Sequence, residues 1–211
     1  NAYRYGLFPM AEDATVETFF LYEPEMRGLL PIETLHIPKR LAKTLREGKF
    51  NVTFNAAFAS VIDGCAEPTP KRPKTWINRP IRDIFVILHQ AGHAHSIECW
   101  NNSGELVGGL YGLALGGVFF GESMFSRETD ASKVALAHLM ARLWAGGFSI
   151  CDIQFINNHL LQFGAYEIPQ SEYLSLLEKV LPQQATLTGP QIKNRFKNED
   201  ELIRAYLNYL K

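Results

Sequence analysis

The sequence predicts an α+β protein whose helices flank a mixed β-sheet. Its 211 residues are enough for one substantial core, and 46% of them are apolar. Three stretches of strand-like sequence follow one another over residues 95–125, separated by turn signals at residues 101–104 and 116–117. A strand–helix–strand pattern over residues 118–155 then predicts a crossover that places two strands parallel in one sheet.

Caps and periodicity predict the other elements. Asn78 is expected to cap one helix, and Asp130 is expected to cap the longest helix, over about 131–145. Asn198 with Glu201 should begin a final helix. Apolar residues at helical spacing predict a further helix over 54–65. We also expect a helix opened by Pro38, a strand at 149–155, a helix at 158–163, a strand at 165–168 and a helix at 171–180.

The chain divides into two parts of different character. Residues 1–27 are aromatic and irregular, and we expect them to form a small N-terminal lobe. Residues 28–211 carry the regular patterns and should form the larger domain.

Composition indicates a cytoplasmic monomer. No stretch approaches the length of a membrane span, and no signal-peptide pattern stands at the start. Cys65, Cys99 and Cys151 are far apart, which favours buried free thiols over disulfides or a metal site. Nothing in the pattern demands an oligomer.

Two groups of polar residues stand out on apolar strands. Glu122 follows the run 117–120, where an ionised carboxylate needs a partner. Asp152 and Gln154 are two residues apart, so they should share a face of the next strand. Both groups lie at carboxyl ends of strands joined by one crossover, which predicts that they are neighbours at a site for a cation or an amine. The alternatives are a Glu122–Arg127 ion pair and a polar strand end without function.

Positive charge is concentrated in one part of the sequence. The whole chain has a net charge of -1, yet residues 36–82 carry ten Lys and Arg against three acids. We expect a local polyanion site there, and Glu and Gln are too rare nearby to neutralise it. Trp76 could stack on an unpaired base. The alternatives are a solvated face and a core tryptophan. The candidate nucleic-acid ligands are Lys39, Arg40, Lys43, Arg46, Lys71, Arg72 and Lys74.

Several other chemistries find no support. His89 and His93 are four residues apart, but Gly92 interrupts the helix and no further ligand completes a metal set. The chain has no nucleophile elbow, no P-loop and no G-x-G-x-x-G motif. We therefore expect neither a metal nor a cofactor.

Seven sequence blocks resemble the leucyl/phenylalanyl-tRNA–protein transferase family. The similarity runs from about residue 2 to residue 180, and two blocks, Gly-His-Ala-His-Ser and Gly-Glu-Ser-Met-Phe-Ser, are the most specific. The blocks are Phe8-Pro9, residues 75–77, 92–96, 106–112 and 120–126, Ala131-Ser132-Lys133, and Asp152-x-Gln154.

This resemblance implies an N-acetyltransferase-like (GNAT) domain and a reaction. The reaction moves Leu or Phe from aminoacyl-tRNA to proteins with N-terminal Arg or Lys, which marks them for degradation. Glu122 would bind the acceptor's basic side chain, Asp152 and Gln154 would orient the attacking amine, and Trp76 would contact the terminal adenosine. The aminoacyl pocket would be lined by Leu110, Phe119, Met124, Leu139, Leu143 and Cys151.

Two departures from the family pattern concern the N-terminal part. Met10 replaces a common aromatic residue, which softens a wall of the pocket, and the usual Gly-Gly-Asp-Leu block is absent, so we expect a truncated lobe. The resemblance does not cover the tail from about residue 183.

Alternative functions are an acetyl-CoA-dependent N-acetyltransferase and a non-catalytic RNA-binding module. An acetyl-CoA-dependent enzyme would need a glycine-rich loop before the long helix to bind the pyrophosphate. Residues 126–130 contain two acids and no glycine there.

Overall fold

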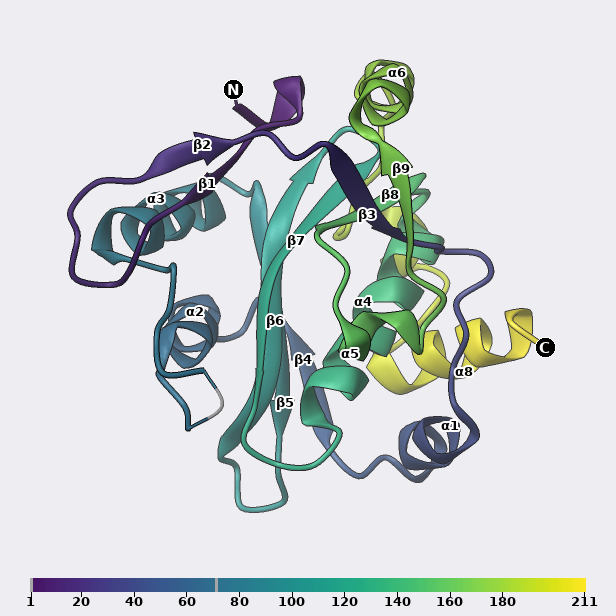
Figure 1. The fold of residues 1–211 in the computed structure, drawn as a ribbon. Helices are drawn as coiled ribbons and strands as arrows, with labels where there is room; N and C mark the ends of the chain where they lie inside the picture. The colour runs from purple at the N-terminus through teal and green to yellow at the C-terminus, as the bar shows by residue number, and fades with distance from the viewer. Residues whose placement is uncertain (1, 71) are drawn as a thin grey trace.

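A twisted seven-stranded sheet with helices on both faces forms the centre of the molecule (Figure 1). The computed structural model describes residues 2–70 and 72–211. The strand order is β4-β5-β6-β7-β8-β3-β9, and β1 and β2 form a separate two-stranded ribbon. The strands are β1 (Phe8–Met10), β2 (Phe20–Tyr22), β3 (Met26–Leu30), β4 (Asn51–Phe54), β5 (Ala94–Trp100), β6 (Leu106–Leu115), β7 (Val118–Ser126), β8 (Ile150–Gln154) and β9 (Tyr166–Pro169).

The mixed α+β class and the predicted crossover are confirmed. Within the large sheet β7 and β8 pair in parallel, whereas all other neighbouring strands are antiparallel. The helical elements are η1 (Ala2–Tyr5), α1 (Lys39–Glu47), α2 (Phe58–Ala66), α3 (Arg79–Gln90), α4 (Ala131–Gly146), α5 (Asn158–Leu161), α6 (Gln170–Val180), α7 (Pro190–Lys193) and α8 (Glu199–Tyr209).

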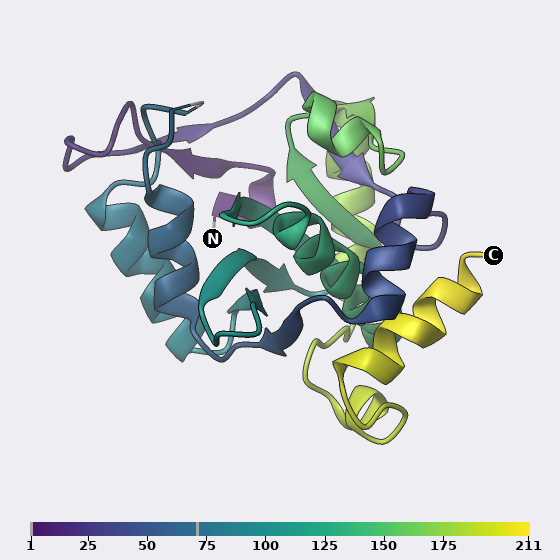
Figure 2. The same ribbon diagram turned by 90° about the horizontal axis from the view of Figure 1, so that it is seen from below.

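The sheet separates two apolar cores. Helices α2 and α3 cover one face, and α4 covers the other with α1 and α8 outside it (Figures 1 and 2). Alternate residues of β7 enter the two cores, with Val118 and Phe120 on the α2 side and Phe119 on the α4 side. Helix α4 is mostly apolar and almost wholly buried, as expected for a helix between a sheet and further helices, and its Arg142 pairs with Glu199 of α8.

Helix caps were predicted with mixed success. Asn78 and Asn198 each accept a hydrogen bond from a backbone N–H of the first turn, as expected. Asp130 precedes α4 but makes no capping bond, because its backbone is left-handed (φ 71°) and its carboxylate accepts a hydrogen bond from Lys133 instead. The predicted capping by Asp130 is therefore wrong.

Four short strands were not predicted. Residues 51–54 form β4, so the helix expected over 54–65 begins only at Phe58. The N-terminal residues, expected to be irregular, form η1 and the β1–β2 ribbon, and β3 then inserts into the large sheet between β8 and β9. The division of the chain at residue 27 stays a prediction, although β3 spans it.

Candidate active site

A cavity opens where the two parallel strands diverge. Strands β7 and β8 pair only over Val118–Phe120 and Ile150–Asp152, although both continue further. Beyond that point they enclose a cavity of about 240 Å³, closed by α4 and α5. It is lined by Leu110, Tyr111, Gly121, Glu122, Ser123, Met124, Leu136, Leu139, Cys151, Ile153, Gln154, Phe155, Asn157, His159 and Leu160.

Most residues expected around an aminoacyl side chain line this cavity. Leu110, Met124, Leu139 and Cys151 do so, and burial raises the pKa of the Cys151 thiol, which leaves it neutral. The other two predicted residues are Phe119 and Leu143. They do not line the cavity, because both are fully buried in the core on the α4 side.

A second cavity of about 190 Å³ adjoins the first beneath the β1–β2 ribbon. Met10 and Trp76, both expected to contact the donor, line it together with Phe8 and Pro9. The two cavities share a wall made of Glu122, Ile153, Gln154, Phe155 and Asn157. Glu122 and Gln154 therefore lie close together, as the crossover predicts, while their role in one functional site stays a prediction.

Glu122 reaches this wall through a β-bulge. In the β6–β7 ladder Tyr111 lies opposite Ser123 and Gly112 opposite Gly121, so Glu122 is the extra residue. Its carboxylate accepts a hydrogen bond from the Tyr3 hydroxyl at 2.7 Å. It makes no ion pair with Arg127, which contacts Glu67 at 2.7 Å. Removal from water raises the pKa of Glu122 to about 8, against the lowering effect of the Tyr3 bond.

Asp152 lies behind the wall in a fully buried network. Arg27 donates to both of its oxygens at 2.7–2.9 Å, and Tyr173 donates to Oδ2 at 2.6 Å. The backbone N–H of Gln154 donates to Oδ1 at 2.9 Å. Arg27 also donates to the carbonyl of Gly6 at 2.8 Å, which ties the N-terminal segment to the same group. Both oxygens of the Asp152 carboxylate therefore already accept hydrogen bonds from the protein.

Gln154 faces the cavities, unlike Asp152. The β3–β8 ladder pairs Gly28 with Gln154 and Leu29 with Asp152, so a second bulge separates the two polar residues. Gln154 also has a left-handed backbone (φ 56°). The prediction that Asp152 and Gln154 share a strand face is therefore wrong. The Gln154 Nε2 is buried and has no hydrogen-bond partner within the part of the chain that the structure describes.

Comparison with known proteins decides the family. A family model described as leucyl/phenylalanyl-tRNA protein transferase matches residues 29–178. The enzyme so named from Rhodopseudomonas palustris TIE-1 is 52% identical over 90% of this chain and 84% of its own length. Those from Nitrobacter winogradskyi (54%; 88% and 82% covered) and Novosphingobium aromaticivorans (57%; 85% and 68% covered) are similarly close.

This chain belongs to the leucyl/phenylalanyl-tRNA–protein transferase family. Among solved structures, L-PGS from Bacillus licheniformis aligns with 72% of this chain and 48% of its own at a TM-score of 0.41 and 10% identity. That similarity is too low to establish a shared fold. None of the described helices is long and apolar enough to cross a membrane.

The basic residues of this family member do not form one surface. Helix α1 lies beside α4 and α8, whereas residues 72–76 lie beyond α2 on the opposite side of the sheet (Figures 1 and 2). The single basic lobe expected from the sequence is therefore two separate groups. Lys71 lies outside the described residues. Arg72 donates to the carbonyls of Cys65 and Glu67, and Lys74 is exposed.

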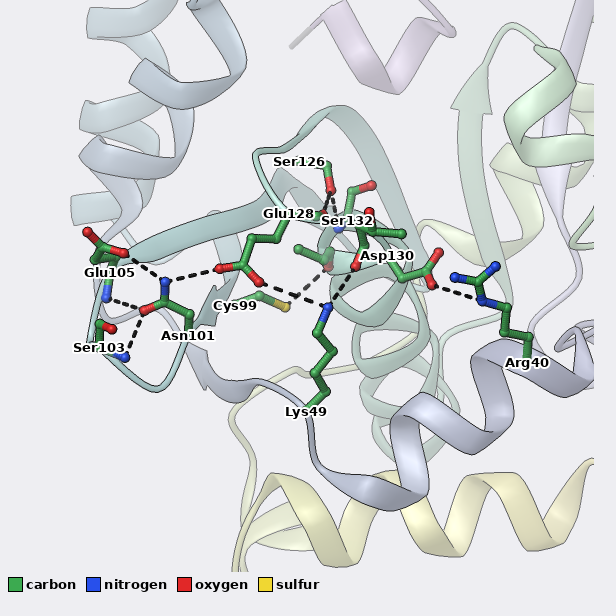
Figure 3. A network of polar contacts seen from close by, with 12 residues as sticks. Arg40, Lys49, Cys99, Asn101, Ser103, Glu105, Ser126, Glu128, Asp130 and Ser132 are labelled. Atoms are coloured by element: carbon green, nitrogen blue, oxygen red, sulfur yellow. Dashed lines mark hydrogen bonds and ion pairs between the residues drawn. The ribbon is translucent and has the colours of Figure 1, made fainter.

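Acidic residues partly neutralise the α1 group, contrary to expectation. Lys43 pairs with Glu47 at 3.7 Å, and Arg40 reaches Asp130 at 4.0 Å (Figure 3). Lys39 and Arg46 are exposed and form no ion pair with any of residues 2–70 and 72–211. These two cations are the strongest remaining candidates for phosphate contacts on α1.

The loop before α4 is built from protein contacts that leave little room for a pyrophosphate. Glu128 lies 3.9 Å from Lys49 and accepts a hydrogen bond from Asn101 at 3.0 Å (Figure 3). The Ser126 hydroxyl accepts from the Ser132 backbone N–H at 3.2 Å, so this N-terminal amide of α4 is already occupied. The acetyl-CoA-dependent alternative would need such amides free.

Sequence reasoning missed the residues that support the site. Tyr3, Arg27 and Tyr173 come from three distant segments, and no local pattern links them. The one available signal was Arg27 itself, a lone cation directly before an apolar run. The three cysteines are free and buried, as predicted. Among the described residues no group of His, Cys, Asp and Glu could hold a metal ion.

Proposed function

We propose that this protein transfers Leu or Phe from aminoacyl-tRNA to the α-amino group of polypeptides that begin with Arg or Lys, which marks them for degradation. The observation that carries the proposal is the shared wall, where Glu122 and Gln154 stand between an apolar cavity and a cavity bordered by Trp76. Membership of the family supplies the reaction class, and this wall supplies a place for it.

The two cavities suit the two ends of the donor. The Leu or Phe side chain would occupy the apolar cavity beside Met124 and Leu139, and the terminal adenosine would stack on Trp76. The ester that joins them then lies along the shared wall. The acceptor nitrogen attacks the ester carbonyl carbon, the bond to the ribose oxygen breaks, and that oxygen takes the proton lost by the amine. The step needs no cofactor and no covalent enzyme intermediate.

Glu122 would select the acceptor by charge. With its pKa raised to about 8 by burial, the Glu122 carboxyl group is largely protonated at neutral pH. An arriving guanidinium or ammonium group favours the ionised form, so that binding of a basic side chain and loss of the carboxyl proton are coupled. A neutral side chain offers no such gain.

Gln154 would act on the reacting groups, with Asp152 as its support. No hydrogen bond among the described residues engages the Gln154 side-chain amide. Its oxygen can therefore accept a hydrogen bond from the attacking amine. The only part of Gln154 that Asp152 contacts among the described residues is the backbone N–H, so Asp152 would position Gln154 and would not itself orient the attacking amine.

The proposal extends to fold type, state and location. A parallel strand pair that diverges to form the substrate cavity supports the GNAT-like assignment. The expectation that the protein acts as a monomer stays a proposal. Buried free thiols and an aminoacyl-tRNA donor support a cytoplasmic location.

Transfer of labelled Leu or Phe from charged tRNA to short peptides tests the proposal. We expect labelling of peptides that begin with Arg or Lys and little labelling of an otherwise identical peptide that begins with Ala. Absence of transfer, or equal labelling of all three peptides, would overturn it.

A further inference from the structure

The β1–β2 ribbon exposes an unusual row of apolar side chains. Phe19, Phe20, Leu21 and Tyr22 are 37–51% exposed, so both faces of β2 are only partly covered. The outer edge of β2 pairs with no other strand in the described part of the chain. An apolar strand with a free edge attracts other extended chains, and proteins usually avoid such edges unless they use them.

This row is continuous with the candidate active site. Tyr22 packs edge-on against Phe155, with ring centroids 5.6 Å apart, and both rings contact Phe8. Phe155 is itself 43% exposed and lines both cavities. A chain that leaves the shared wall past Phe155 therefore meets β2 directly.

Charge around the ribbon favours a polypeptide over RNA. Between Arg4 and Arg27 the sequence has five acids and no Lys or Arg. Glu17 pairs with Arg79 at 2.9 Å, but Glu23 and Glu25, which directly follow β2, form no ion pair with the described residues. These carboxylates repel phosphates and attract a cationic chain end.

The ribbon is held in a fixed position beside the site. The Asn78 side chain, which also caps α3, donates to the carbonyls of Val16 and Thr18 at 2.8 and 2.9 Å. An edge fixed in this way can receive an extended chain without first becoming ordered.

We propose that β2 binds the acceptor polypeptide immediately after its first residue, as an added β-strand. The inference rests on the proposed function, since it places the acceptor's first residue at Glu122. Main-chain pairing along an edge gives affinity with little dependence on sequence. Such a surface suits acceptors that share only their first residue, and Phe20 and Leu21 would add apolar contacts to their next side chains.

The test compares a short and a long acceptor. Arginine amide reaches only the shared wall, whereas a hexapeptide beginning with Arg also reaches β2. We expect the wild-type protein to show a lower KM for the hexapeptide. The double variant Phe20→Ser/Leu21→Ser should raise the hexapeptide KM about fivefold or more, because it removes the apolar surface that the longer acceptor would cover. Its KM for arginine amide and for charged tRNA should stay within about twofold.

A matched control and a backbone probe make the test specific. Ile87→Ser removes another exposed apolar side chain, 63% exposed on α3, and should change none of these constants. N-methylation of successive hexapeptide amides after the first residue should raise KM at alternate positions only, because alternate N–H groups of a strand face its partner.

Distinct results would overturn this inference and the proposed function. Equal wild-type KM values for amide and hexapeptide, uniform effects of N-methylation, or a changed KM for tRNA in the double variant would each contradict binding at β2. In all three cases transfer to arginine amide would still proceed. Absence of transfer to arginine amide and hexapeptide alike would instead defeat the proposed function.

Discussion

Glu122 and Asp152 are two carboxylates in one region with opposite surroundings. Asp152 accepts hydrogen bonds from Arg27, Tyr173 and a backbone amide, and nothing more can approach it. Within the part of the chain that the structure describes, Glu122 has one hydrogen-bond partner, Tyr3, and it borders both cavities. Such a difference separates a structural carboxylate from one that is available to a ligand.

The raised pKa of Glu122 has a consequence for stability. Its folded-state pKa of about 8 exceeds the ordinary value of 4.5. Ionisation therefore favours the unfolded chain: the penalty is absent below pH 4.5 and grows as pH rises to about 8. Relative to wild type, Glu122→Gln should therefore gain about 4 kcal/mol of unfolding free energy as the pH rises from 4.5 to 8.5.

Urea unfolding of the two proteins at both pH values measures this difference. Comparing wild type with the variant at each pH removes the contribution of other titrating groups. A difference that does not change with pH would mean that Glu122 is ionised and well solvated in the folded protein.

At the scale of elements, the sequence predicted long elements well and short ones poorly. Helices α3, α4 and α8 carry caps or long apolar patterns, and β5, β6 and β7 are joined by clear turns, so local signals suffice for them. Strand β3 has only five residues, and its partners β8 and β9 lie more than a hundred residues away. Its position is decided by tertiary pairing, which a local pattern does not record.

The candidate site was predictable to a similar extent. The crossover rule placed Glu122 and Gln154 together because it depends only on topology. The two bulges that set the orientation of these side chains were not predicted. A bulge is a mismatch between two paired strands, so the sequence of one strand alone does not reveal it. The same bulge in β8 is the reason that the i, i+2 rule failed for Asp152 and Gln154.

The buried ion pair between β3 and β8 should matter strongly for stability. Arg27→Met would leave the Asp152 carboxylate buried without its cation, and the Gly6 carbonyl would lose a donor. We expect a loss of about 3–5 kcal/mol in unfolding free energy. Denaturant unfolding at pH 7 measures it, and a loss below about 1 kcal/mol would show that the pair is not buried in the folded protein.

At the scale of the whole molecule, the basic residues form two groups on opposite sides of the sheet. Only the group on α1 lies beside α4. Lys39 and Lys43 of α1 are candidates for contacts with the tRNA backbone, although Lys43 is paired with Glu47. We expect Lys39→Ala/Lys43→Ala to weaken tRNA binding and to lower the slope of log affinity against log salt. The slope should fall by about 0.7–0.9 for each phosphate that the variant no longer neutralises.

Single variants separate the two lysines. Lys39→Ala should account for most of the change, because Lys43 has a carboxylate partner to replace phosphate. Lys74→Ala, on the loop across the sheet, serves as the comparison from the other basic group. If the slope of log affinity against log salt is unchanged in the α1 variants, the basic residues of α1 do not contact tRNA and form an ordinary solvated surface.

Glu122, in the shared wall, is proposed to recognise the positive charge of the acceptor's first side chain. The most direct measurement is the ratio of kcat/KM for a peptide beginning with Arg to that for the same peptide beginning with citrulline, which has the same shape without the charge. We predict a ratio of about ten or more in the wild-type protein and a ratio near one in Glu122→Gln. A ratio near one in the wild type, or the same ratio in both proteins, would contradict the account.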